Sequence, residues 1–298
     1  MKIARPTLIA NAALSTLIFW GCTSSPMGDD EISLGARQLS GSVVLDDRKS
    51  SEGVYVWLDG FNLGDYTDAE GKFQVTLPPV SSQGTPGGVT GVFKLYAYIA
   101  NYNLASTQMR TLNGVFLFGQ DNITDRGELN APLRLENFLR VSTVVRPASA
   151  SIVAGDTVKV QVTLQRPALY QGGAIIARLL KLCVHGNCPP ETFGAILVRN
   201  VQSGETRLIQ NPGATSRDLI QVETAPITHT MAFLPAEVNL SLGQYEAIPY
   251  LLLEHGEAVP MNLLQGIGTN VFEYGLDYLK IPFRREGGAF TVTADAGQ

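Results

Sequence analysis

Charged and reactive side chains are scarce in this chain of 298 residues. Only 16% of the residues are charged, a low value for a cytosolic helical protein and a common one among secreted β proteins. There are three histidines and no H-E-x-x-H, G-x-S-x-G, P-loop or dinucleotide-binding motif. We therefore expect a protein that is not an enzyme and that holds neither a cofactor nor a metal ion.

Long apolar runs are also missing, apart from one at the N-terminus. Lys2 and Arg5 precede a short apolar run from Thr7 to Phe19, which is too short for a permanent membrane-spanning helix. The run ends at Cys22, and this order of basic, apolar and cysteine elements resembles the signal peptide of bacterial lipoproteins. The resemblance implies cleavage after residue 21, lipidation of Cys22 and a tether over residues 22–38. An ordinary secretory peptide with an incidental cysteine is the alternative.

The tether begins with Thr23, not with the aspartate that retains lipoproteins of Gram-negative bacteria in the inner membrane. By that resemblance we expect an outer-membrane lipoprotein of the cell envelope, bound to the membrane through its lipid. Loss of Lys2 and Arg5 with the signal leaves 20 basic residues against 27 acidic ones, a net charge of −7. This charge and the lack of basic runs exclude nucleic acid as a partner.

Two further cysteines, Cys183 and Cys188, flank the segment Val-His-Gly-Asn. The Gly-Asn pair favours a turn, so a small-loop disulfide formed in an oxidising compartment is the main interpretation. The alternative makes Cys183, His185 and Cys188 metal ligands. A zinc site needs a fourth ligand, and none is close in the sequence.

The segment from Gly53 to Pro79 has the pattern of a β-hairpin with an acidic turn. Lys72 to Leu77 alternates strictly, which predicts Phe73, Val75 and Leu77 in the core. We expect the side chains of Thr67 and Asp68 to bond the backbone of the turn Asp68-Ala-Glu-Gly71, where Gly71 permits the bend. Calcium binding by the acidic segment 59–70 (Asp59, Asp65, Asp68 and Glu70) is an open alternative, although the spacing differs from that of an EF-hand.

Several motifs of this region resemble the carboxypeptidase regulatory-like family. They are Gly41-Ser-Val, Gly53-Val-Tyr-Val, Thr67-Asp-Ala-Glu-Gly-Lys-Phe73, Leu77-Pro78, and Lys94 to Tyr98 followed by Asn101-Tyr102, where Asn101 replaces the usual glycine. The resemblance covers residues 39–135 and implies a transthyretin-like β-sandwich, a structural or interaction module without catalysis. Related transthyretin-like hydrolases use histidines, and this segment has none.

The remaining residues also predict strands. Val158, Val160, Val162 and Leu164 alternate with polar residues and should face a core. We expect further strands that include 245–253 and 278–283, and insertions near 202–220 and 254–269. Leu240 to Tyr245 resembles the tyrosine corner of immunoglobulin-like sandwiches.

The sequence as a whole predicts an all-β fold with two β-sandwich domains, transthyretin-like over 39–138 and immunoglobulin- or fibronectin-like over 139–298. We expect a structural or protein-interaction module with a protein partner in an envelope or surface assembly. Tyr55 and Trp57 share one face of a strand that points away from the core of the first domain. That face is either the contact with the second domain, which we favour, or a platform of a carbohydrate- or peptide-binding protein.

Overall fold

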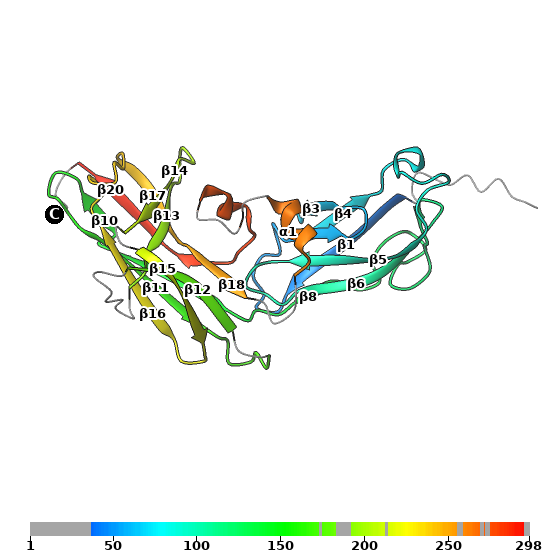
Figure 1. Ribbon diagram of the computed structural model, residues 1–298, viewed down its shortest axis with the longest axis horizontal. Coiled ribbons are helices and arrows are strands. Elements are labelled where there is room, and N and C mark those ends of the chain that lie inside the picture. The colour runs from blue at the N-terminus through cyan, green and yellow to red at the C-terminus, as the bar shows by residue number, and fades with distance from the viewer. Residues whose placement is uncertain are drawn as a thin grey trace, which may run out of the picture.

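The fold is almost entirely β, as the sequence predicts. The computed structural model describes residues 37–172, 175–182, 192–211, 214–254, 259–268, 271 and 275–294. Strands β1 to β8 build the first sandwich, which we call domain one, and strands β9 to β20 build domain two. Figure 1 shows the two domains placed end to end, with α1 (Met261–Ile267) between them.

Domain one consists of two packed sheets. One sheet has the order β4–β1–β8 and the other has the order β3–β2–β5–β6–β7. Their strands are β1 (Gln38–Leu45), β2 (Tyr55–Leu58), β3 (Leu63–Tyr66), β4 (Lys72–Thr76), β5 (Gly91–Tyr98), β6 (Ala105–Leu112), β7 (Val115–Phe116) and β8 (Leu133–Leu135). A 3₁₀ helix, η2 (Val80–Ser82), follows β4.

Apolar residues at every second position of these strands form the core of domain one. Phe73, Val75 and Leu77 are 5%, 4% and 0% exposed, which confirms the alternation read from β4. They pack in one cluster with Leu39 of β1 and Leu95 of β5.

Domain two has three sheets. Their orders are β10–β20–β17–β13–β14, β16–β11–β9–β19 and β15–β12–β18. The strands are β9 (Arg140–Arg146), β10 (Ser149–Ser151), β11 (Val158–Gln165), β12 (Ile175–Leu182), β13 (Ala195–Asn200), β14 (Thr206–Gln210), β15 (Ala214–Val222), β16 (Ile227–Phe233), β17 (Gly243–Pro249), β18 (Leu251–Glu254), β19 (Glu286–Gly287) and β20 (Ala289–Thr293).

The core of domain two confirms the alternation predicted for β11. Val158, Val160, Val162 and Leu164 are each 0% exposed. The tyrosine corner is confirmed as well, because the Tyr245 hydroxyl donates a hydrogen bond of 2.9 Å to the carbonyl of Ser241, four residues upstream.

Three predictions of local structure are wrong. Residues 278–283 are not a strand, because Leu276–Lys280 forms a 3₁₀ helix, η3. The buried residues Tyr278 and Ile281 are three positions apart, which is one turn of such a helix. The expected insertion at 202–220 contains most of β15, an edge strand that was not predicted, whereas the strand expected at 207–210 is confirmed as β14. The expected strand at 245–253 is divided between β17 and β18, which belong to different sheets.

The Gly53–Pro79 segment also differs in part from a single hairpin. β2 pairs with β3 across a turn at residues 59–62, and the chain then crosses to the other sheet, where β4 pairs with β1. The crossing turn has the bond predicted for Asp68, whose Oδ1 accepts from the Lys72 amide at 2.7 Å. Thr67 does not bond this turn, because its Oγ1 accepts from the Val54 amide at 2.8 Å, in the segment before β2. Gly71 takes the positive φ of 75° that the turn requires.

None of the helices among the described residues has the length and apolar character needed to cross a membrane.

Candidate functional site

The most elaborate site of the described residues is the contact between the two domains. It begins with five aromatic residues on the outer face of the five-stranded sheet of domain one, which we call the aromatic face: Tyr55, Trp57, Tyr66, Tyr96 and Tyr98. The strand register places them together, because Tyr55 lies opposite both Tyr66 and Tyr98, and Trp57 lies opposite Tyr96. Ring centroids are 5.1 Å apart for Tyr55 and Tyr66 and 5.8 Å apart for Trp57 and Tyr96, within the range of favourable aromatic pairs.

Segments of domain two cover this face. The helix α1 lies closest where it carries Gly266, and a Cβ atom built there would be 2.7 Å from the Tyr55 hydroxyl and 3.7 Å from the Trp57 indole. The Tyr66 hydroxyl donates to the carbonyl of Lys280 at the end of η3, at 3.5 Å. Glycine thus allows the helix backbone to approach the rings closely.

Burial of the two rings decides between the alternatives for Tyr55 and Trp57. They are 4% and 1% exposed, and both belong to the same apolar cluster as Leu263 and Leu264 of α1. The indole nitrogen of Trp57 donates to Asn62 Oδ1 at 3.1 Å. Tyr55 and Trp57 therefore belong to a domain contact. The alternative that these two rings form a glycan-binding platform is wrong, because a covered ring has no surface on which a sugar can stack.

A polar contact continues the junction beside the aromatic face. Asn101 is 1% exposed, and its side-chain amide donates to the carbonyls of Leu139 and Arg284 at 2.9 and 3.0 Å. The side-chain oxygen of Asn101 accepts a hydrogen bond from the main-chain amide of Arg284 at 3.0 Å. One side chain of domain one therefore satisfies both main-chain groups of a residue in domain two.

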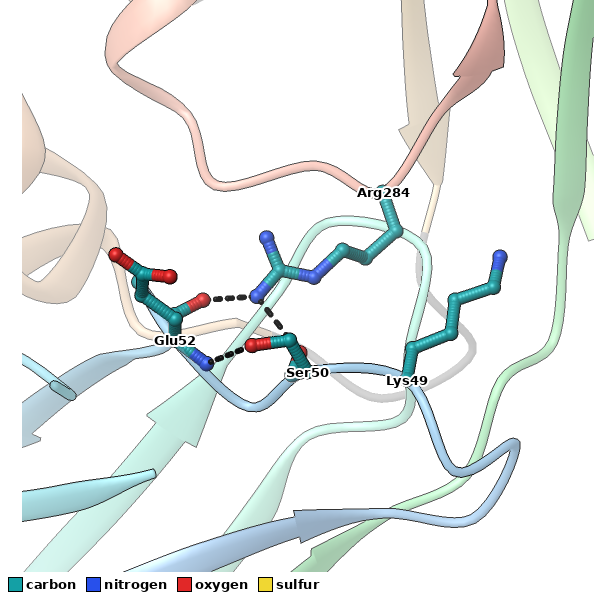
Figure 2. A pocket seen from close by; sticks show the side chains of 5 residues that line it. Lys49, Ser50, Glu52 and Arg284 are labelled. Carbon is teal, nitrogen blue, oxygen red and sulfur yellow. Dashed lines mark hydrogen bonds between the residues drawn. The ribbon is translucent and has the colours of Figure 1, made fainter. Parts of the chain in front are cut away.

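Arg284 lies against a loop of domain one (Figure 2). Its guanidinium donates to the main-chain carbonyls of Ser50, at 3.3 Å, and Glu52. These groups line a shallow hollow together with Lys49 and Gly53. The guanidinium is used to join the two domains.

Burial shifts the pKa values of two side chains near the junction, Tyr102 and Arg284. The Tyr102 hydroxyl donates to Asp47 Oδ2 at 2.7 Å, and burial together with this bond raises the pKa of Tyr102. Burial lowers the pKa of Arg284, and the negative charge of Asp47 nearby partly offsets this effect by raising it. Lys49 Nζ reaches Glu286 Oε1 of domain two at 2.5 Å. Across the junction, the described residues thus include one ion pair, Lys49–Glu286, beside the bonds of Arg284 to main-chain carbonyls.

The acidic segment 59–70 does not gather into one site. The carboxylates of Asp59, Asp65 and Asp68 each accept a hydrogen bond from a nearby backbone amide, at 2.8 Å from Gly60, 2.7 Å from Tyr66 and 2.7 Å from Lys72 respectively. In the part of the chain that the structure describes, no three His, Cys, Asp or Glu side chains lie close enough to hold a metal ion. The oxygens that calcium would need serve the turns.

Some predicted site residues lie outside the described residues: Cys22, Cys183, His185, Cys188 and His255. Lipidation and the disulfide therefore stay predictions. His229 is described and is 2% exposed in β16, inside domain two. Arg284, Asn101 and Gly266 were missed as junction residues. A signal existed for Arg284, which opens the sole Arg-Arg pair of the sequence, and for Asn101, which departs from the glycine that the resemblance of residues 39–135 implies.

The comparisons with known proteins assign no family. No protein-family model matches the chain, and no curated protein matches it. Among solved structures, the major pilin subunit BcpA of Bacillus cereus has a TM-score of 0.27 and 8% identity over 73% of this chain and 66% of the pilin. The major pilin SpaD of Corynebacterium diphtheriae has a TM-score of 0.24 and 9% identity over 74% and 62%. The chain thus spans less than two thirds of SpaD, and likenesses this weak assign neither family nor function.

Proposed function

We propose that this chain is a lipid-anchored protein of the cell envelope, non-enzymatic, that acts as a structural or protein-interaction module in an envelope or surface assembly. The anchor is the lipid on Cys22, and the outer membrane is its site because Thr23 follows the cysteine. The resemblance of residues 39–135 to carboxypeptidase regulatory-like modules supports the interaction role.

The observation that carries the proposal is the position of the two domains relative to the tether. β1 begins at the end of domain one that lies farthest from domain two (Figure 1). The tether of residues 22–38 leads to that end, and the apolar cluster shared across the junction holds domain two at the opposite end. A rigid two-domain spacer that presents its far domain to a partner is what this arrangement provides.

Fixed domain orientation distinguishes a spacer from two modules on a flexible linker. Domains joined by few contacts move relative to one another. Here three buried rings of the aromatic face (Tyr55, Trp57 and Tyr98), a buried amide with three hydrogen bonds and the Arg284 contacts lie at the junction. The cost of separating the domains would be the exposure of all these groups.

The test is crosslinked co-purification from native envelopes, run with the wild type, a Cys22→Ala variant and a Ser24→Ala control. We expect the wild type and the control in the membrane fraction with a stoichiometric protein partner, and the Cys22→Ala variant released without that partner. Wild-type protein in the soluble fraction would contradict the anchor. Membrane-bound protein that never brings down a partner would contradict the assembly role.

A further inference from the structure

The outer face of the five-stranded sheet changes in character along its length. In β5 the outward residues are Tyr98, Tyr96, Lys94 and Val92. Domain two covers the first two, whereas Val92, at the other end of the strand, is 59% exposed. Outward positions of a solvated strand are ordinarily polar, so an exposed valine at this end requires an explanation.

Val92 is part of a larger apolar surface, the aliphatic patch, formed by Val92, Leu112, Val115 and Leu117. Val92 lies opposite Arg110 in β6, Leu112 lies two residues further on the same face, and Leu112 lies opposite Val115. The amide of Leu117 donates to the carbonyl of Arg110 at 3.0 Å. Leu112 is 46% exposed, and Val115 and Leu117 are half-buried.

The two segments that border the patch are uncharged, and the charges near it are Lys94 of β5 and the pair of Arg110 with Asp121. Residues 78–93 and 111–120 contain no Asp, Glu, Lys or Arg, although the whole mature chain is acidic. Arg110, in the middle of the patch, pairs with Asp121 at 3.2 Å. The rest of the charged segment 121–128 runs from Asp121 toward β1, where the carbonyl of Gly127 accepts a hydrogen bond from the Ser40 amide.

One side chain holds the two uncharged segments together. The amide nitrogen of Gln83 donates to the carbonyls of Pro78 and Gly114 at 2.9 and 2.8 Å. Its oxygen accepts from the Val89 amide at 2.9 Å. The loop that contains η2 is thereby fixed to the β6–β7 turn beside Leu112 without any ion pair.

This end of domain one is also where the tether joins it. The amide of Leu77, directly before Pro78, donates to the carbonyl of Arg37 at 2.8 Å. Fourteen residues, 23–36, separate Cys22 from Arg37. A chain of fourteen residues reaches at most about 48 Å, so a membrane that holds Cys22 lies within reach of the patch.

We propose that the aliphatic patch of domain one rests on the lipid bilayer that carries the Cys22 anchor, and that domain two points away from it. This inference rests on the proposed function, because it needs the anchor. Aliphatic side chains enter the boundary of headgroups and acyl chains favourably. The uncharged loops around them avoid the repulsion that an acidic surface meets at anionic headgroups. The tether itself and a second copy of the chain are the competing occupants.

The test uses the lipidated full chain in vesicles of phosphatidylethanolamine and phosphatidylglycerol, with and without brominated acyl chains that quench tryptophan. After removal of residues 1–21 the chain has one tryptophan, the buried Trp57, whose signal in the wild type is the background. A Leu112→Trp variant places a second indole on the patch. Leu242→Trp is the matched control, because Leu242 is 55% exposed in domain two and precedes β17 at the end remote from domain one (Figure 1).

We expect brominated lipid to lower the added emission of Leu112→Trp about twofold and to leave that of Leu242→Trp unchanged. If neither variant is quenched although the protein floats with the vesicles, the inference is overturned and the anchor stands. The tether or a second copy would then cover the patch. Quenching of both would overturn it as well, because the molecule would lie flat. Failure of the wild type to float would instead refute the proposed function.

Discussion

At the scale of single residues, the junction depends on Asn101. The resembling family has glycine at this position, and the asparagine here uses its whole amide to hold one residue of the other domain. Both groups that it satisfies belong to the main chain of Arg284. The Asn101 side chain itself is buried, and losing its three hydrogen bonds costs more than losing one surface bond.

We predict that Asn101→Ala lowers the free energy of unfolding by about 2–3 kcal/mol, because it removes a buried hydrogen bond to the Leu139 carbonyl and two partly buried ones to the main chain of Arg284. Urea unfolding followed by circular dichroism measures the change. The control is Asn103→Ala, which loses an exposed bond of 3.3 Å to Glu136 and should cost under about 0.5 kcal/mol. Equal effects of the two substitutions would contradict the role assigned to Asn101.

At the scale of elements, sequence pattern predicted the strands that have one solvated and one buried face. β4 and β11 are such strands, and their alternation placed Phe73 and Val160 in the core correctly. Elements whose environment is decided by distant parts of the chain were not predicted. η3 places the buried Tyr278 and the carbonyl of Lys280 at the junction, and α1 lies in what the sequence presented as an insertion.

The same limit applies to the candidate site. The shared face of Tyr55 and Trp57 follows from the period of two in a strand. Which surface covers them depends on α1, more than 200 residues later in the chain. Gly266 gives no local signal either, since its lack of a side chain matters only against the rings that it meets.

We predict that Gly266→Leu displaces α1 from the aromatic face, because a Cβ at this position would lie 2.7 Å from the Tyr55 hydroxyl. Displacement exposes Trp57, and we expect the acrylamide quenching constant of its fluorescence to rise about twofold or more, since close-packed interiors exclude the quencher. Gly275→Leu is the control, because a Cβ there has no heavy atom within 4 Å. A buried, unquenched Trp57 in Gly266→Leu would show that α1 tolerates a side chain and does not depend on the glycine.

At the scale of the whole molecule, the apolar cluster of domain two extends into domain one. It includes Tyr55, Trp57 and Tyr98 together with residues of β11 and β13. Domain one has a second cluster of its own around Leu39 and Phe73. Two cores that share a buried boundary should stabilise each other, whereas domains on a flexible linker unfold independently.

We predict that the two domains unfold in a single calorimetric transition and that Trp57→Ala divides it into two. Trp57→Ala and Phe73→Ala each remove a large buried ring at a cost of about 3–5 kcal/mol, but only Trp57 lies at the junction. Phe73→Ala should therefore lower the transition temperature and keep one transition. Two transitions in the wild type, or a division caused by Phe73→Ala alone, would contradict the shared boundary. The proposed spacer role needs that boundary, because the two domains keep one relative direction only while α1 stays on the aromatic face.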